Sequence, residues 1–122
     1  MKEIAYTSLP LGLVFDDDVL SIVRVSRDYN SRAGITGYLA YDGEAFLQVI
    51  EGPDAAVDSL YDRILEDPRH HQIVLLADGP VRTRAFADWA MGYRRVKSVI
   101  DEVGPASGAE SFAQRLSVLL KA

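Results

Sequence analysis

The sequence predicts an α+β domain: a five-stranded mixed sheet with two helices on one face and a C-terminal helix on or near the other. Two observations predict this class. Segments with strand alternation and segments with helical spacing follow each other in the order β-α-β-β-α-β-β-α. The 122 residues, of which 48% are hydrophobic and 25% charged, suffice for one core of this kind.

The N-terminal part contains a strand and then a helix. Residues 2–8 alternate as a strand does, and Leu9-Pro10 is expected to end it. Aspartates at residues 16–18 favour the start of a helix through capping and negative charge, and Gly34 favours its end. The apolar stripe of this helix leads to Asn30. Asn30 therefore either lies in the core or, in the last helical turn, caps its own backbone.

The middle of the chain is predicted to be a hairpin with one unexpected residue. Two runs of strand formers, 35–41 and 44–50, flank Asp42-Gly43, which favours a tight primed turn. Alternation places Gln48 among apolar side chains on one face of the second run. An unpaired buried carboxamide costs about 1–3 kcal/mol, so we expect a polar partner for it. Glu51 is expected to stay solvated or to pair locally.

The next elements are a second helix and a fourth strand. Pro53 suits the first turn of a helix that is expected to end near Asp67-Pro68. The continuous apolar run of residues 73–77 indicates a buried strand, which Gly79-Pro80 is expected to break.

Residues 89–93 are predicted to form the fifth strand. Alternation would place Trp89, Met91 and Tyr93 on one face of it. Considered by residue type alone, Trp89 and Met91 are expected to fill the core and Tyr6 to be a half-buried strand tyrosine, because aromatic stripes usually serve packing.

The C-terminal part is expected to be a linker, residues 97–108, and an amphipathic helix, residues 109–120. We therefore divide the chain into a domain of residues 1–96 and a C-terminal region of residues 97–122. The sheet face opposite the two main helices is too apolar for water, so we expect this last helix or a second subunit to cover it.

The order of the elements indicates a ferredoxin-like sandwich. In this topology we expect the first and third strands to be parallel neighbours at the centre of the sheet. Tyr6 and Gln48 would then lie side by side, and Asn30 would approach them from the first helix. Three polar side chains would thus meet in an apolar interior.

Composition limits the possible functions. The formal net charge of −5 argues against a nucleic acid partner, which would require a basic face. The sequence lacks a membrane-spanning run and a secretory start, so we expect a cytoplasmic protein. Without cysteine there are no disulfides, cysteinyl adducts or cysteine metal sites. No metal is expected, since His70-His71 lacks the spacing and third ligand of a site.

Six short stretches of the sequence occur together in a recognisable order. They are IAYTS at residues 4–8, SRDYN at 26–30, GITG at 34–37, FLQVIEG at 46–52, DPRH at 67–70 and FADWAM at 86–91. In this order and spacing, over residues 4–94, the chain resembles the BLUF domains, which are blue-light sensors that use FAD. It looks like the short, stand-alone form of these sensors.

The resemblance implies a noncovalent FAD photoreceptor with assigned residues. It implies that Tyr6 is the photochemical electron donor, that Gln48 is the switch amide beside flavin N5 and O4, and that Asn30 hydrogen-bonds the isoalloxazine. Trp89 and Met91 match a pair whose inward and outward exchange would relay the signal. Positions near the ribityl and phosphate groups, where cationic side chains suit a diphosphate, are matched by Arg63, Arg69 and His70.

The chemistry of the residues agrees with this implication. An excited flavin is a strong oxidant, and a phenol such as Tyr6 is readily oxidised if its proton can leave. The Gln48 amide can accept that hydrogen bond and donate another, then reverse or tautomerise. We hypothesise that light drives proton-coupled electron transfer from Tyr6 through Gln48 to FAD, and that the signal passes to the C-terminal region or to a partner protein. Tyr29, where many members carry Asn or His, leaves the contacts beside Asn30 open.

Other functions were weighed against the sensor. A small flavin-dependent redox enzyme would need a substrate pocket and a source of electrons, for which 122 residues leave little room. A hydrolase of the acylphosphatase kind would need an arginine in the loop of residues 9–15, which has none. A cofactor-free interaction module is the remaining alternative. We expect a protein that is not an enzyme, self-associates as a homodimer or higher oligomer, and acts on a downstream partner protein.

Overall fold

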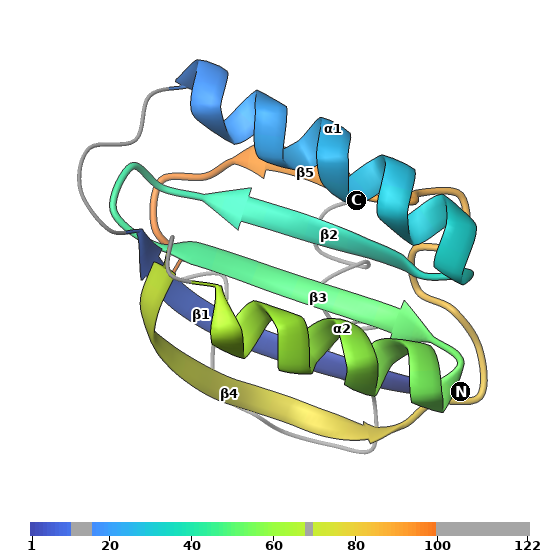
Figure 1. The fold of residues 1–122 in the computed structure, drawn as a ribbon. Helices are drawn as coiled ribbons and strands as arrows, with labels where there is room; N and C mark the ends of the chain where they lie inside the picture. The colour runs from blue at the N-terminus through green and yellow to red at the C-terminus, as the bar shows by residue number, and fades with distance from the viewer. Residues whose placement is uncertain (11–15, 68–69, 100–122) are drawn as a thin grey trace.

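The computed structural model describes residues 1–10, 16–67 and 70–99, and it confirms the predicted ferredoxin-like sandwich. A five-stranded sheet carries both helices on one face (Figure 1). The predicted helix of residues 109–120 lies outside the described residues, as does Arg69. The elements are β1 (Lys2–Pro10), α1 (Asp16–Ala33), β2 (Thr36–Tyr41), β3 (Phe46–Gly52), α2 (Asp54–Glu66), β4 (His70–Pro80) and β5 (Gly92–Arg95).

The strand order is β4-β1-β3-β2-β5, so β1 and β3 are neighbours at the centre as expected. The predicted parallel pairing of these two strands is wrong, because they run antiparallel. The crossover through α1 makes β1 and β2 run in the same direction, and the hairpin then reverses the chain. β3, inserted between them, must oppose both. The parallel pairing of β2 with β5 makes the sheet mixed.

The β2–β3 connection is longer than the predicted two-residue turn. Tyr41 pairs with Phe46, which leaves four residues in the loop. The Asp42 carboxylate accepts hydrogen bonds from the backbone N–H groups of Glu44 and Ala45, each at 2.8 Å. Gly43 has a φ of +96°, which an L side chain rarely adopts. The side chain of Asp42 therefore stabilises a wider turn than the Asp-Gly dipeptide suggested.

β4 is an edge strand rather than the buried strand predicted for residues 73–77. Only β1 pairs with it among the described strands, and Val74 and Leu75 are 54% and 48% exposed. Gly79-Pro80 does not break it, since pairing continues to Pro80 opposite Lys2. Its apolar run therefore indicated a strand but not its place in the sheet.

The fifth strand begins later than predicted, at Gly92 instead of residue 89. Residues 89–91 approach the sheet in an irregular bend, and the Trp89 carbonyl accepts a hydrogen bond from Gly37 N–H at 3.0 Å. Strand alternation does not apply across a bend. Trp89 and Met91 consequently lie on opposite faces of the sheet, which contradicts the prediction that they share one.

Two apolar clusters sandwich the sheet, as the alternation in β3 predicted. Phe46 and Ile50 pack under the helices, whereas Leu47 and Val49 pack on the opposite face. On that opposite face the described cover comes from the chain beyond β4, which contributes Ala85, Phe86, Trp89, Val96 and Val99. Cover by the last helix or by a second subunit stays a prediction.

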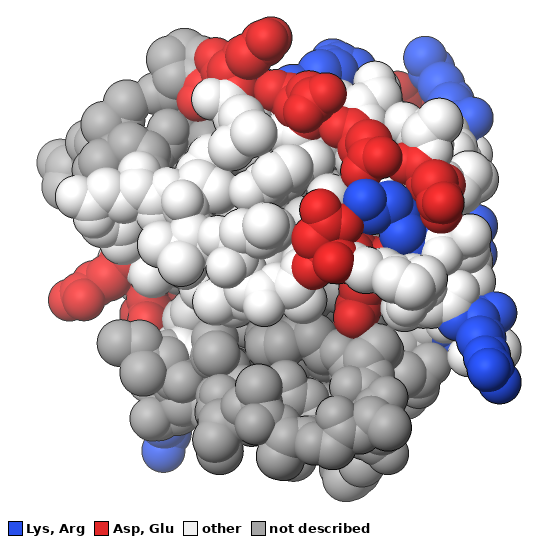
Figure 2. Space-filling view, turned by 90° about the horizontal axis from the view of Figure 1, so that it is seen from below, with Lys and Arg blue, Asp and Glu red and all other residues white. Residues whose placement is uncertain are grey.

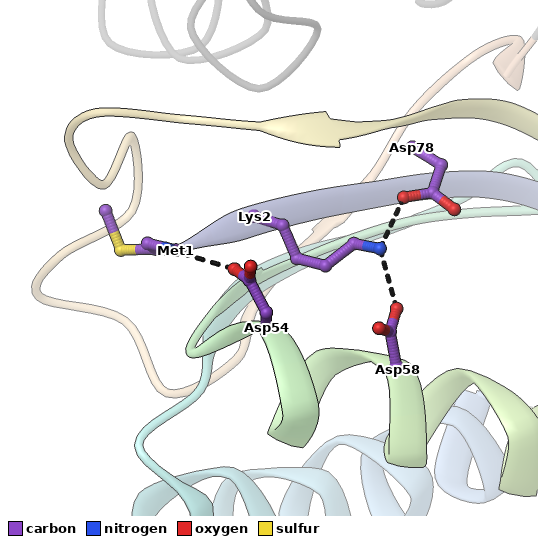
Figure 3. Close-up of polar contacts among 5 residues, drawn as sticks. All are labelled: Met1, Lys2, Asp54, Asp58 and Asp78. Carbon is purple, nitrogen blue, oxygen red and sulfur yellow. Dashed lines mark hydrogen bonds and ion pairs between the residues drawn. The ribbon is translucent and has the colours of Figure 1, made fainter.

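Charged groups hold the start of β1 between α2 and β4 (Figure 3). Lys2 Nζ lies 2.6 Å from Asp58 Oδ1 on α2 and 2.7 Å from Asp78 Oδ1 on β4. The Met1 amino group lies 3.0 Å from Asp54. Hydrogen bonds to Asp58 and Asp78 raise the pKa of Lys2, so it stays charged at neutral pH.

The exposed face of α2 is acidic. Four exposed carboxylates recur at a spacing of four residues, Asp54, Asp58, Asp62 and Glu66, and acidic side chains form a band across the molecule seen from below (Figure 2). The apolar side of the same helix faces the sheet, where Val57 is fully buried. Neither described helix is long and apolar enough to cross a bilayer.

We predict that Asp42 makes the stability of the fold depend on pH. Burial alone would raise its pKa, but hydrogen bonds from Ala45, Val99 and Glu44 outweigh burial and leave the pKa below its usual value. A lowered folded-state pKa means that the contribution is complete above the unfolded value of about 3.9 and lost as pH falls through the folded pKa. In urea unfolding at pH 6 and pH 3, Asp42→Asn should lose less stability on acidification than the wild type. The exposed Glu44→Gln is the control, and equal pH dependence of wild type and Asp42→Asn would contradict the prediction.

Candidate functional site

Tyr6 and Gln48 form a polar pair at the centre of the sheet, beneath the helices. They are direct cross-strand partners of β1 and β3, and strand alternation turns both toward the helix-covered face. The Tyr6 hydroxyl donates a hydrogen bond to Gln48 Oε1. The polar partner that the sequence required for Gln48 is therefore Tyr6.

A cavity of about 230 Å³ lies above this pair, between the two helices. The sheet forms its floor, and α1 and α2 form its walls. It is lined by Tyr6, Ile22, Val25, Ser26, Tyr29, Asn30, Gln48, Leu60, Arg63, Ile64 and Asp67. The sheet and helices thus bring together four of the predicted site residues, Tyr6, Asn30, Gln48 and Arg63.

The lining has the chemistry of a site for a flat ring with one polar edge. Aliphatic side chains such as Leu60 and Ile64 can contact ring faces, while the amides of Asn30 and Gln48 can pair with ring heteroatoms. Arg63 is exposed, and its guanidinium carbon lies 4.7 Å from the centroid of the Tyr29 ring. A cation there can also meet an anionic tail. The residues present therefore fit a flavin.

The Tyr6 hydroxyl stays protonated under ordinary conditions. Burial raises the pKa of Tyr6, and the negative charges of ionised Tyr61 and Asp67 raise it further. Tyr61 packs against it with a centroid distance of 5.7 Å. Tyr6 can therefore act as a hydrogen-bond donor to Gln48, and any loss of its proton must be coupled to another event.

Asn30 lies in the core rather than capping its own helix. It is 1% exposed, and its Nδ2 donates to the carbonyl of Ala90 at 2.7 Å. One turn earlier on α1, Arg27 Nε donates to the carbonyl of Met91 at 2.9 Å. Two side chains of α1 therefore hold the bend that leads into β5.

Met91, not Trp89, contacts the polar pair. Met91 is 1% exposed, and Gln48 Nε2 lies 4.0 Å from its sulfur, the distance of a weak hydrogen bond. Trp89 lies on the other face of the sheet and stacks on Phe86 at a centroid distance of 5.6 Å. The sequence left open which of the two residues faces the site, and the bend at residues 89–91 decides it.

The two remaining residues predicted to bind flavin lie at or directly after residues 68–69, which the structure does not describe. Arg69 is one of these two residues, and His70 opens β4 opposite Pro10. Among the described residues, no three His, Asp or Glu side chains gather as metal ligands would.

Several lining residues were not predicted. Ser26 belongs to a helix face whose periodicity was visible, so the helix pattern could have placed it near the site. Asp67 was predicted as a helix end and as part of the DPRH stretch, but not as a residue that reaches the cavity, which it does. Glu51 was expected to stay solvated or to pair locally. It is not solvated, since it is fully buried; it pairs with Thr36 on the neighbouring strand and also with the distant backbone of residues 85 and 86, which the sequence did not indicate.

Fold and cavity together define a small domain of the ferredoxin-like class with a cavity between its sheet and its two helices, lined by both apolar and polar side chains. A family model described as sensors of blue light using FAD matches residues 1–92. The chain belongs to the BLUF family, and its domain is a blue-light flavin sensor.

Curated relatives of the matched region are much longer proteins. Photoactivated adenylate cyclase subunit beta of Euglena longa is 38% identical over 78 residues, which make up 64% of this chain and 9% of that protein. Subunit alpha of Euglena gracilis is 42% identical over 62 residues, 51% of this chain and 6% of that protein. The chain therefore spans only a small part of the length of these relatives.

Solved structures agree in fold over most of the described domain. The dark-state structure of the BLUF protein BlrB has 39% identity and a TM-score of 0.73, covering 77% of this chain and 71% of that one. Klebsiella pneumoniae BlrP1 with FMN and cyclic diGMP has 31% identity and a TM-score of 0.72, covering 77% and 25%.

We predict that the Asn30 bond to Ala90 stabilises the fold before any cofactor binds. Asn30→Ala should lower the free energy of unfolding by about 1–3 kcal/mol, because a buried amide pairing is lost and the carbonyl of Ala90 loses its donor. Chemical unfolding of the flavin-free protein measures this. The neighbouring exposed Ser31→Ala should stay within about 0.5 kcal/mol of the wild type. Equal stability of the two variants would contradict the assignment.

Proposed function

We propose that this chain is a blue-light photoreceptor that binds FAD noncovalently in the cavity between α1 and α2. The observation that carries the proposal is the Tyr6–Gln48 hydrogen bond on the cavity floor. It joins an oxidisable phenol to an amide with both a donor and an acceptor end. Few packing arrangements require such a pair in an apolar interior, whereas a light-driven switch does.

Named residues of the chain can hold the cofactor. Gln48 and Asn30 can meet the polar edge of the ring, and the aliphatic cavity walls can meet its faces. Positive charge for the ribityl and diphosphate groups would come from Arg63, Arg69 and His70. The family description favours FAD, although the BlrP1 structure was obtained with FMN.

Bound flavin supplies absorption of blue light and, once excited, strong oxidising power. Tyr6 would give one electron to the excited flavin, and its hydroxyl proton would leave along the existing hydrogen bond to Gln48 Oε1. The raised pKa of Tyr6 keeps this proton in place until the electron leaves. When the electron and a proton have returned to Tyr6, the Gln48 amide would be left reversed or tautomerised. Its hydrogen bonds would then differ, although no atom of the amide has been gained or lost.

The signal leaves through Met91. A rearranged Gln48 changes the group that faces the Met91 sulfur, and Met91 belongs to the bend that leads into β5. We propose that residues 1–96 act as the sensing domain and that residues 97–122 receive the change. Val99 N–H already donates to Asp42 at 3.0 Å, which ties the start of that region to the hairpin. Self-association, a cytoplasmic location and a downstream partner protein complete the proposal. The chain itself is proposed to carry no catalytic step.

The decisive prediction concerns Tyr6 and Gln48. Wild-type protein should be yellow and show a small, reversible red shift of the flavin band in blue light. Tyr6→Phe should bind flavin but lose the reversible shift, because the donor is gone, and Gln48→Leu should lose it because the amide is gone. Tyr41→Phe, another buried tyrosine on the same side of the sheet, should respond as the wild type does. Light-minus-dark spectra measure all four proteins.

Contrary outcomes are distinct. A normal shift in Tyr6→Phe or Gln48→Leu would refute the switch. A colourless wild type that takes up no added flavin would refute the photoreceptor and favour an interaction module. Bleaching by a substrate, without a red shift, would favour a redox enzyme.

The identity of the cofactor is tested separately. Because the proposed binding is noncovalent, acid or heat denaturation should release the whole flavin, and chromatography should identify it as FAD. Release of FMN alone would contradict FAD. Flavin that stays with the denatured chain would contradict noncovalent binding.

A further inference from the structure

Glu51 is a buried carboxylate near the end of β3 that the proposed photochemistry does not use. It is fully buried, and burying an unpaired carboxylate costs several kcal/mol. Its oxygens accept hydrogen bonds from Ala85 N–H at 2.9 Å, Phe86 N–H at 2.7 Å and Thr36 Oγ1 at 2.9 Å. Two of these donors are backbone groups more than thirty residues away in sequence. Glu51 therefore fixes the main chain of the β4–β5 connection.

Arg84 holds the same connection from its other side. Its Nη2 donates to the carbonyl of Gly34 at 2.7 Å, and its Nη1 donates to Thr36 Oγ1 at 3.0 Å. Thr36 also donates to Glu51, so its hydroxyl links the arginine to the carboxylate. Residues 84–86 are thus anchored to Gly34, Thr36 and Glu51 through four hydrogen bonds of 2.7–3.0 Å.

The anchored segment lies close to the residue that contacts Gln48. A turn follows in which Trp89 N–H donates to the carbonyl of Phe86 at 2.9 Å and the two rings stack. Met91 comes two residues later. The stretch from Phe86 to Met91 is too short and too well bonded to take up a shift at one end without moving the other.

Side chains of β3 therefore contact the β4–β5 connection on both faces of the sheet. Gln48 reaches Met91 on the helix-covered face, and three residues later Glu51 reaches Ala85 and Phe86 on the opposite face. We propose that Glu51 is a positioning residue whose carboxylate holds residues 84–91 so that Met91 lies against Gln48. In the light-sensing function proposed above, on which this second part rests, Glu51 then sets the rate of return to the dark state.

The protein contains its own probe for this inference, because Trp89 is its single tryptophan. In full-length, flavin-free protein, Glu51→Gln should shift Trp89 emission to longer wavelength and increase its quenching by acrylamide. An amide offers only one acceptor oxygen and places an N–H group against a backbone donor. Glu51→Ala should give a larger change than Glu51→Gln. The exposed Glu44→Gln should give none.

A second variant guards against misfolding. Arg84→Met keeps the buried carboxylate and removes the other anchor, so it should shift Trp89 emission in the same direction. In flavin-loaded protein, Glu51→Gln and Arg84→Met should keep the red shift, because Tyr6 and Gln48 are intact. Their dark recovery rates should differ several-fold from those of the wild type and Glu44→Gln.

The outcomes separate the two proposals. Unchanged Trp89 emission and quenching in both Glu51→Gln and Arg84→Met would overturn the positioning role. Changed emission with an unchanged recovery rate would overturn its link to the light response. If the wild type itself gives no light response, the photoreceptor proposal fails, and the flavin-free Trp89 comparison still decides whether Glu51 positions the connection.

Discussion

The hydrogen bond between Tyr6 and Gln48 places the strictest demand on the structure. Tyr6 is buried and Gln48 is half-buried, and leaving a buried polar group without its hydrogen bond costs about 1–3 kcal/mol, so the strands must bring the two side chains into direct register. Side chains alternate with a period of two, and a slip of one residue between β1 and β3 would turn Gln48 to the other face. The antiparallel pairing, the length of the hairpin and the apolar alternation of β3 all act to prevent that slip.

Much of this arrangement could be predicted because it depends on local patterns. The bounds of α1, the hairpin and the anomaly of Gln48 follow from spacing and residue type within short windows. The relative direction of β1 and β3 was predicted wrongly, although the sequence contains the information: the crossover through α1 and the β2–β3 hairpin together make the two strands antiparallel. The place of β4 at the edge could not be found from its apolar run, because burial of Val74 depends on which strands lie beside it.

The parts that the sequence did not reveal depend on contacts between distant segments. Nothing near Glu51 indicates that its partners include backbone groups of residues 85–86, and a carboxylate that is solvated or paired locally was the natural expectation. The bend before β5 has the same origin. Strand alternation would place Trp89 and Met91 on one face. Hydrogen bonds from Arg27, Asn30 and Gly37 instead hold the main chain of residues 89–91 in a bend. Hydrogen bonds between a side chain and a distant backbone group produce no periodic pattern in the sequence around either residue.

The position of Met91 beneath the helices is therefore determined more by the hydrogen bonds that hold the main chain of residues 89–91 than by the contact of its side chain with Gln48. The interaction of its sulfur with Gln48 Nε2, at 4.0 Å, is weak. The bonds that hold the bend are shorter, and each contributes about 0.5–1.5 kcal/mol. Trp89 stacks on Phe86 and meets the Tyr38 ring at a tilt on the far face. An exchange of Met91 and Trp89 would have to break these interactions together, at a cost of several kcal/mol. In the proposed light response, a small rearrangement of Gln48 would therefore be transmitted at lower free-energy cost as a shift of the whole anchored segment than as an exchange of the two side chains.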